Sequence, residues 1–264
     1  MLVSLTMIPT ATVLALLMVT LQAHAANPAD LAELYEAHTY QAADGGEMPY
    51  RLLMPENYDP QKQYPLVVLL HGAGERGSDN QSPLQWGAAQ FTDPANRQAY
   101  PAFVVVPQCP QSRAWSVDEF GELRRPRFGE PAEMMTRVLG LIAELDEDYA
   151  IDPARRYAMG LSMGGYGVWD IITREPGLFA AAVPICGGGD ADAAPNAREV
   201  PIWAFHSSDD PVVPVATTRS MVQAVRAAGG EVTYTEYADR GHNAWSPAFD
   251  NAGLLPGLFD QRRT

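Results

Sequence analysis

Positive charge is scarce in this 264-residue sequence, and lysine is nearly missing. Lys62 is the only lysine, and 18 Lys and Arg residues face 32 Asp and Glu residues, which gives a formal net charge of −14 at pH 7. A surface of this sign repels phosphate backbones and anionic lipid headgroups. We therefore expect no nucleic-acid partner and no membrane insertion of the mature chain.

Cysteine is also scarce, with one residue at Cys109 and one at Cys186. Each follows an apolar run that reads as a strand, and the ends of two strands that are not neighbours lie too far apart for a disulfide. We expect two buried or half-buried thiols, while a disulfide formed in an oxidising compartment is the alternative. No Cys or His pair has the spacing of a metal site, so we expect neither a metal nor an organic cofactor.

Residues 1–25 contain no Asp, Glu, Lys or Arg. Their apolar run "VLALLMV" is followed by Ala23-His24-Ala25, a small-x-small pattern. These features predict a secretory signal peptide that is removed after about Ala25, and hence a secreted or periplasmic protein. The absence of a basic residue before the run is atypical. A membrane anchor is the alternative, but the run is short for a span and Pro9 interrupts its start.

The remaining residues, 26–264, contain no linker, repeat or low-complexity tract, and they suffice for one large domain. Short apolar runs alternate in them with segments of helical spacing. The expected strands are 65–72, 101–107, 155–162, 179–187, 200–208 and 232–238, preceded by an antiparallel pair at 38–43 and 48–55 that is joined at Asp44-Gly45-Gly46. Helices are expected over 131–149, directly after Ser162, over 214–228, and over 247–262 with an interruption at Pro256. This alternation predicts one α/β domain with a doubly wound, mostly parallel sheet of about eight strands.

A serine lies among glycines in the segment Gly160-Leu161-Ser162-Met163-Gly164, which fits the pattern G-x-S-x-G. The pattern alone is only a modest signal, but here an apolar strand runs into it and a helical pattern runs out of it. That context is typical of a strand–turn–helix that holds a nucleophilic serine in strained geometry. We therefore interpret Ser162 as the candidate nucleophile.

A serine nucleophile needs a base, and the base needs an acid that orients it. In the chain order serine, acid, histidine, only His242 follows both Ser162 and a plausible acid. The acid is expected directly after the strand at 200–208, where Asp209 and Asp210 stand side by side. We choose Asp210 and interpret Asp209 as a turn or capping residue, with the reverse assignment as the alternative.

Two backbone N–H groups are required to hold the oxyanion that forms during acyl transfer. We assign one to Met163, the residue after the nucleophile, and the other to Ala73 in the small-residue loop that follows the first central strand. Trp115 and Trp245 are candidate substrate-binding residues because both lie in loops after strand ends, where such sheets bind ligands. Partial burial in the core is the alternative for each tryptophan.

Five sequence blocks, spread over about residues 45–262, are typical of one known family: "LLHGAGERG", "PQCP", "GLSMGGYGVWD", "DDPVVP" and "GHNAW". They resemble the serine α/β-hydrolases, specifically the secreted esterases grouped with dienelactone hydrolases, feruloyl esterases and prolyl-oligopeptidase-like peptidases. The resemblance implies the α/β-hydrolase fold and hydrolysis of carboxylic esters through an acyl-enzyme. Dienelactone hydrolases proper use a cysteine nucleophile, so Ser162 argues against their substrate class.

Only residues 187–199 separate the strand at 179–187 from the strand that precedes the acid, which is too short for a separate cap domain. An open cleft is therefore expected. The leading hypothesis is an exported serine carboxylesterase that acts on short or aromatic acyl esters, either linked to polysaccharide as feruloyl or acetyl groups or present in a polyester. The alternatives are a serine peptidase of the prolyl-oligopeptidase-like group and a non-catalytic binding module on a hydrolase fold. The sequence leaves the oligomeric state open.

Overall fold

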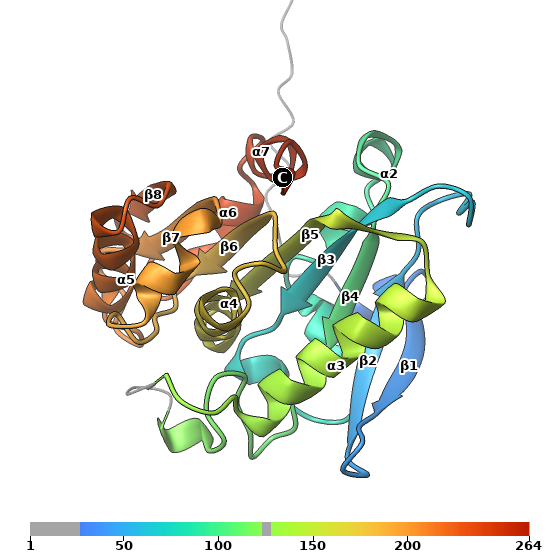
Figure 1. Ribbon diagram of the computed structural model, residues 1–264, viewed down its shortest axis with the longest axis horizontal. Helices are drawn as coiled ribbons and strands as arrows, with labels where there is room; N and C mark the ends of the chain where they lie inside the picture. The colour runs from blue at the N-terminus through green and yellow to red at the C-terminus, as the bar shows by residue number, and fades with distance from the viewer. Residues whose placement is uncertain (1–26, 123–127, 264) are drawn as a thin grey trace, which may run out of the picture.

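The computed structural model describes residues 27–122 and 128–263, so the expected signal peptide lies outside the described residues. One sheet of eight strands forms the centre of the molecule, in the order β1-β2-β4-β3-β5-β6-β7-β8 (Figure 1). The strands are β1 (Glu36–Gln41), β2 (Glu47–Leu53), β3 (Tyr64–Leu70), β4 (Phe103–Pro107), β5 (Ile151–Leu161), β6 (Ala181–Ile185), β7 (Ile202–Ser207) and β8 (Val232–Tyr237).

The sheet is antiparallel only at one edge. Strand β2 runs antiparallel to both β1 and β4, and every other neighbouring pair is parallel. All seven residues of β3 and all five of β4 are buried, which explains why these strands are apolar without alternation. The predicted antiparallel pair and the predicted mostly parallel sheet are both confirmed, and the chain has the α/β-hydrolase fold.

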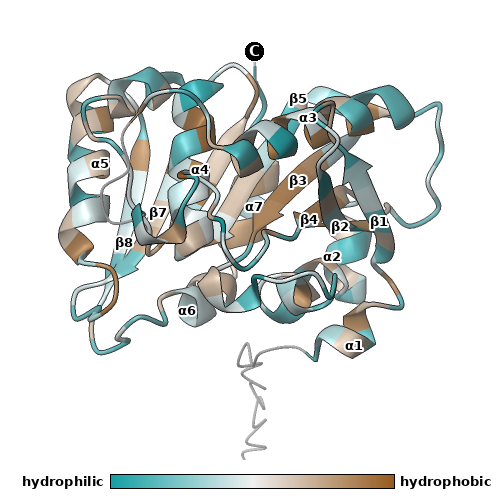
Figure 2. Ribbon diagram, turned by 90° about the horizontal axis from the view of Figure 1, so that it is seen from below, coloured by the Kyte–Doolittle hydropathy of each residue, from teal (hydrophilic) through white to brown (hydrophobic). Residues whose placement is uncertain are grey.

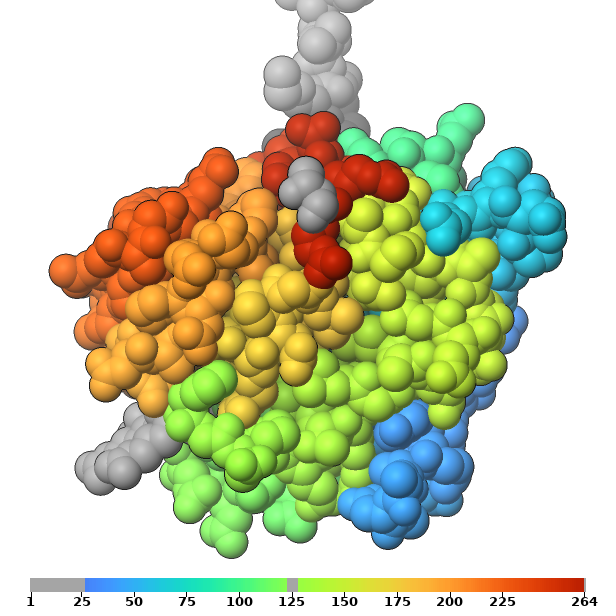
Figure 3. All heavy atoms as spheres, in the orientation of Figure 1, coloured from blue at the N-terminus to red at the C-terminus, as the bar shows by residue number. Residues whose placement is uncertain are grey.

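Helices cover both faces of the sheet, as Figure 2 shows. Helices α3 (Glu133–Asp148), α4 (Met163–Arg174) and α5 (Val215–Ala227) pack on one face and enclose the larger apolar core. In Figure 3 the side chains of α3, in yellow-green, spread over this face of the molecule. Helices α1 (Pro28–Leu31), α2 (Pro94–Ala99), α6 (Trp245–Phe249) and α7 (Leu254–Phe259) lie toward the other face, where α1, α6 and α7 contribute to a second core. The helices expected over 131–149, after Ser162 and over 214–228 are thus confirmed.

The last helical segment differs from the sequence prediction. Its break lies between α6 and α7, over residues 250–253, and Pro256 is the third residue of α7 rather than an interruption. A proline is tolerated there because the first N–H groups of a helix have no acceptor within it. The expectation of a break at Pro256 was therefore wrong.

The remaining helical turns are short 3₁₀ helices at Ala73–Glu75, Ser82–Gln85, Ala89–Phe91, Phe120–Glu122 and Ala194–Glu199. The last of these is the only helix between β6 and β7, and it packs against α4 and α5. This segment therefore forms no cap over the carboxyl ends of the strands. Among residues 27–122 and 128–263, every helix is too short or too polar to cross a membrane.

The crossing of β5 and α4 is so close that it excludes side chains. A Cβ atom built on Gly164 would overlap the carbonyl oxygen of Leu70 in β3, and one on Gly160 would lie 2.5 Å from the carbonyl oxygen of Gly164. Backbone therefore packs directly on backbone at this point. This contact holds the turn that carries Ser162 at the carboxyl end of β5.

The crossing predicts a position-specific cost of adding one methyl group. Gly164→Ala is expected to lower the free energy of unfolding by about 2–4 kcal/mol, because the backbone of β3 cannot move aside. Gly129→Ala is the matched control, since a Cβ there has no heavy atom within 4 Å. Urea denaturation of both variants provides the measurement, and equal stabilities would contradict the close crossing.

Candidate active site

Ser162 occupies the turn between β5 and α4 with φ 51° and ψ −116°. A positive φ is strained for a residue with a side chain, and such strain is concentrated at functional positions. The Ser162 N–H donates to the carbonyl of Ile185 at 2.9 Å, which ties the turn to the end of β6. The side chain does not cap α4, so its hydroxyl is directed to another partner.

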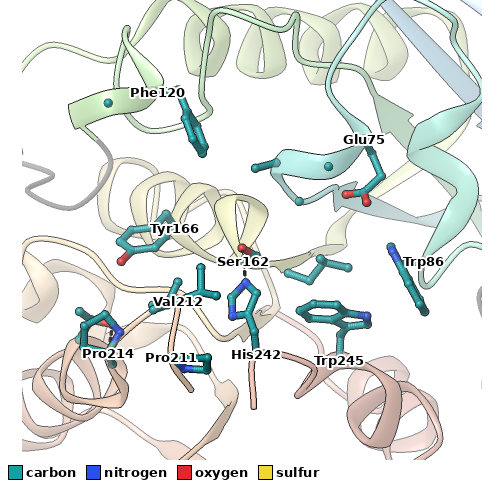
Figure 4. A pocket seen from close by; sticks show the side chains of 17 residues that line it. Glu75, Trp86, Phe120, Ser162, Tyr166, Pro211, Val212, Pro214, His242 and Trp245 are labelled. Carbon is teal, nitrogen blue, oxygen red and sulfur yellow. Dashed lines mark hydrogen bonds between the residues drawn. The ribbon is translucent and has the colours of Figure 1, made fainter. Parts of the chain in front are cut away.

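That partner is His242, whose Nε2 lies 2.9 Å from Ser162 Oγ (Figure 4). On its other side the imidazole approaches Asp210, with 2.7 Å between Nδ1 and Oδ2. Because an ionised carboxylate only accepts hydrogen bonds, the ring proton resides on Nδ1 and the Nε2 lone pair faces the serine hydroxyl. The structure thus brings together the three residues singled out in the sequence, from the turn after β5 and the loops after β7 and β8.

The two neighbouring aspartates have different partners. The side chain of Asp210 is fully buried, and its Oδ1 accepts from the N–H groups of Val212 at 2.8 Å and Val213 at 2.9 Å. Asp209 instead accepts from the backbone N–H groups of Arg240 at 3.2 Å and Gly241 at 3.1 Å. The carboxylate of Asp209 therefore holds the loop that carries His242, whereas Asp210 contacts the imidazole itself.

A second histidine, to which the sequence analysis gave no role, also contacts Asp210. His206 is fully buried at the end of β7, and its Nε2 lies 3.2 Å from Asp210 Oδ2. Burial lowers the pKa of His206, while the Val213 carbonyl and Asp210 raise it. The sequence offered one signal for this contact: His206 lies four residues before Asp210, near the end of a predicted strand.

Ser162 and His242 line a cleft that has a volume of about 670 Å³. Figure 4 shows two walls on either side of these residues. One wall includes Glu75, Trp86 and Trp245, and the opposite wall includes Phe120, Tyr166, Pro211, Val212 and Pro214. An ester that spans the cleft would place its carbonyl at Ser162 and its two substituents against these walls.

The residues assigned to the oxyanion site begin helical turns. Ala73 is the first residue of a 3₁₀ helix and lines the cleft, and Met163 is the first residue of α4. The first N–H groups of a helix have no acceptor within it, so they are suited to bind a negatively charged oxygen. The placement is compatible with the assignment, which stays a prediction.

The two tryptophans have different positions. Trp245 lines the cleft, with its ring centroid 5.2 Å from that of His242. Trp115 is fully buried, and its Nε1 donates to the carbonyl of His71 at 3.0 Å, so the expectation that Trp115 contacts substrate was wrong. The second tryptophan of the cleft wall is Trp86, 5.7 Å from Trp245, which the sequence analysis did not consider. It lies in an irregular segment whose path no periodicity specifies.

The loop after β3 is braced by a buried histidine. His71 Nε2 accepts from the N–H of Cys109 at 3.0 Å, and its Nδ1 lies 2.6 Å from the carbonyl oxygen of Gly72. Only a neutral ring can accept at Nε2, and burial lowers the pKa of His71 to about 4. This contact, together with Trp115, fixes the loop that contains Ala73.

Both cysteines are buried free thiols. Burial raises the pKa of Cys109 to about 12 and also raises the pKa of Cys186, so both remain protonated near neutral pH. Possible ligand atoms of Cys186, Asp210 and His242 lie within 4.8 Å of one another. Asp210 and His242 are hydrogen-bonded to each other, however, whereas the ligands of a zinc ion direct their lone pairs at the metal.

A strained serine at a strand–helix turn, connected to a histidine and a buried aspartate at the carboxyl edge of a parallel sheet, defines the class of α/β-hydrolases. The family model Esterase, described as "Putative esterase", matches residues 42–226. The chain therefore belongs to this esterase family.

Similar proteins agree with this assignment. A thermostable esterase of known structure is 41% identical, with a TM-score of 0.82, over 88% of this chain and 64% of that chain. The probable feruloyl esterase C of Aspergillus terreus is 26% identical over 63% of this chain and 56% of its own length. The bifunctional acetylxylan esterase/xylanase XynS20E of Neocallimastix patriciarum is 24% identical over 66% of this chain and 23% of its own length. The chain thus spans less than two thirds of each of these proteins.

The neutral state of His71 predicts a loss of stability in acid. Its pKa falls from 6.5 in the unfolded chain to about 4 in the folded chain, so between these pH values the unfolded state binds more protons. This contribution to stability is fully present above pH 6.5 and is lost as the pH falls toward 4, by about 3 kcal/mol in total. Other groups contribute to the pH dependence as well.

The variant His71→Gln isolates the share of His71, because glutamine cannot take up the proton. Urea denaturation of both proteins at pH 7.5 and pH 4.5 is expected to show a smaller decrease in the free energy of unfolding for the variant. Identical decreases would assign the acid sensitivity to other groups.

Proposed function

We propose that this protein is an exported serine carboxylic ester hydrolase that works through an acyl-enzyme. The observation that carries the proposal is the continuous hydrogen-bond chain from Ser162 through His242 to the buried Asp210, which opens into a cleft large enough for a small ester. The fold and the family support the reaction class, since serine, histidine and aspartate in this order are typical of α/β-hydrolases.

The geometry supports the following sequence of steps. Ser162 Oγ attacks the carbonyl carbon of the ester while His242 Nε2 takes its proton, and the oxyanion is held by the N–H groups of Ala73 and Met163. His242 then gives the proton to the leaving alcohol, and the acyl group remains on Ser162. Water, deprotonated by His242, attacks the acyl carbonyl carbon. The bond from that carbon to Ser162 Oγ then breaks, His242 returns the proton to the serine, and the acid is released. Asp210 keeps the imidazole oriented and stabilises its charged form throughout.

The proposed substrates are short or aromatic acyl esters, carried on a polysaccharide as feruloyl or acetyl groups or present in a polyester. The absence of a cap between β6 and β7 leaves this side of the cleft open to a polymer-attached ester. Trp86 and Trp245 on one wall and Phe120 and Tyr166 on the other offer flat apolar surfaces to an aromatic group. The names of two relatives, a feruloyl esterase and an acetylxylan esterase, point in the same direction.

The serine mechanism is tested by covalent labelling and by pH. We expect a fluorophosphonate to label the native protein and not Ser162→Ala, and we expect kcat for p-nitrophenyl acetate to fall at least 10⁴-fold in that variant, roughly the effect of removing a triad member. In the native protein kcat/KM is expected to fall in acid as His242 becomes protonated. Absence of labelling in the native protein would favour the non-catalytic binding module, and a flat pH profile would exclude His242 as the base.

The aromatic wall is tested with two esters of different acyl size. Trp245→Ala is expected to raise KM for methyl ferulate by about five- to tenfold, because a stacking partner contributes about 1–1.5 kcal/mol. The same variant is expected to change KM for p-nitrophenyl acetate by less, so the acetyl ester serves as the internal control. Equal changes for both esters would remove Trp245 from the acyl-binding wall. Matched p-nitroanilides are expected to react far more slowly than the esters, and comparable rates would favour the peptidase alternative.

A further inference from the structure

His206 occupies a buried position where four parts of the fold meet. It is the penultimate residue of β7, and its ring contacts Thr218 on α5 through Nδ1 at 2.7 Å. On the opposite side of the ring, Nε2 lies 3.0 Å from the carbonyl oxygen of Val213 and 3.2 Å from Asp210 Oδ2. Thr218 Oγ1 in turn lies within hydrogen-bond distance of the carbonyl oxygen of Gly187, which follows β6. The ring therefore connects the sheet, a helix and the loop of the proposed triad acid.

The neighbours of the ring determine where its proton lies. The Val213 carbonyl and the Asp210 carboxylate can only accept hydrogen bonds, so Nε2 must carry a proton. The single proton of the Thr218 hydroxyl goes either to the Gly187 carbonyl, in which case Nδ1 donates to Oγ1 and the ring is charged, or to Nδ1 of the neutral ring. Nε2 is consequently a donor in both the neutral and the charged ring.

Asp210 accepts three hydrogen bonds, and a fourth N–H group, that of His206, lies close to its carboxylate. Its Oδ1 accepts from Val212 and Val213, and its Oδ2 faces Nδ1 of His242 and Nε2 of His206. A fully buried carboxylate that lacks such donors is strongly destabilised. The backbone donors and His242 belong to the usual requirements of an acid in this position, whereas His206 is an additional imidazole on the same oxygen.

We infer, on the basis of the proposed function, that His206 is a positioning residue of the active site, which shares its Nε2–H between the Val213 carbonyl and Asp210 and thereby fixes the carboxylate toward His242. The second donor on Oδ2 holds the carboxylate in one orientation. It also withdraws part of the negative charge that His242 would otherwise experience. His206 thus determines both the orientation of the Asp210 carboxylate and the basicity of the His242 imidazole.

The charged and titratable groups around His242 come from three elements. Asp210 and His206 face it from the loop after β7 and from β7 itself, and the buried Cys186 thiol lies near Asp210 and His242 at the end of β6. Asp209 contacts the backbone of the His242 loop rather than the ring. Of these groups, Asp210 is hydrogen-bonded to the imidazole, and Nε2 of His206 lies 3.2 Å from the same carboxylate oxygen.

Two amide substitutions separate the sides of the ring. In His206→Gln the amide nitrogen can reach the place of Nε2 and retain a donor to Asp210, whereas in His206→Asn it can reach only the place of Nδ1, beside Thr218. We expect kcat for p-nitrophenyl acetate to fall by about 10–100-fold in H206N, with KM changed less than about threefold. In H206Q we expect kcat to stay within about fivefold of the native value.

The pH dependence of kcat/KM distinguishes the two roles, because a change in packing alone would not shift its acid limb. Without the second donor, Oδ2 offers more charge to His242, which stabilises the imidazolium. The acid limb of kcat/KM in H206N is therefore expected to move to higher pH by about 0.5–1 unit, and in H206Q it is expected to stay in place. Thermal unfolding of each variant verifies that the assayed protein is folded.

Thr218→Val is the control for packing, because it removes the hydroxyl on the far side of the ring and leaves Nε2 in place. It is expected to lower thermal stability while the acid limb stays unchanged. Equal losses of kcat in H206N and H206Q, or an unmoved acid limb in H206N, would overturn the positioning role. S162A in the same assay tests the proposed function separately, since activity that persists without Ser162 would refute the serine mechanism whatever the His206 variants do.

Discussion

The buried carboxylate of Asp210 is the constraint on which the site depends. Its side chain has no exposed surface, yet the proposed mechanism requires a charged carboxylate there to stabilise an imidazolium on His242. The fold meets this requirement with backbone N–H groups from Val212 and Val213 and with imidazole N–H groups. The loop after β7 must therefore turn sharply back on itself. Asp209 holds the loop after β8 through the backbone N–H groups of Arg240 and Gly241. The two loops together determine the position of His242, the proposed base.

The proposed nucleophile, Ser162, is held in place by a different kind of interaction. Gly160 and Gly164 let α4 approach the backbone of β5 and β3, and the resulting turn forces Ser162 into a positive φ. The strain is sustained because the turn is also bonded to Ile185 in β6. Steric exclusion thus positions the serine, while hydrogen bonding positions the acid and the base. Both depend on the parallel strands, whose carboxyl ends bring the turn after β5 and the loops after β7 and β8 to one edge of the sheet.

Much of this arrangement could be predicted from sequence because it rests on local signals. Continuous apolar runs predict strands buried on both faces, and the glycines around Ser162 predict a crossing without side chains. The chain order of serine, aspartate and histidine then selects His242. Long-range packing is not encoded in this way. The burial of Trp115 depends on its contact with His71, forty-four residues earlier, and Trp86 and His206 meet the site only through the tertiary fold. Pro256 misled the prediction because a proline is compatible with the first turn of a helix as well as with a break.

Three histidines lie near the carboxyl ends of the parallel strands, and their different surroundings give the same type of side chain different roles. His71 and His206 are both buried, and burial lowers the pKa of each, so both act as fixed hydrogen-bonding groups. His242 keeps 21% of its side-chain surface exposed and faces the cleft with its Nε2. A base must gain and lose a proton in every turnover, so it needs both a carboxylate that stabilises its charge and access to substrate and water. Among these three histidines only His242 has both, which is why we propose His242 as the base and assign the two buried imidazoles no proton transfer.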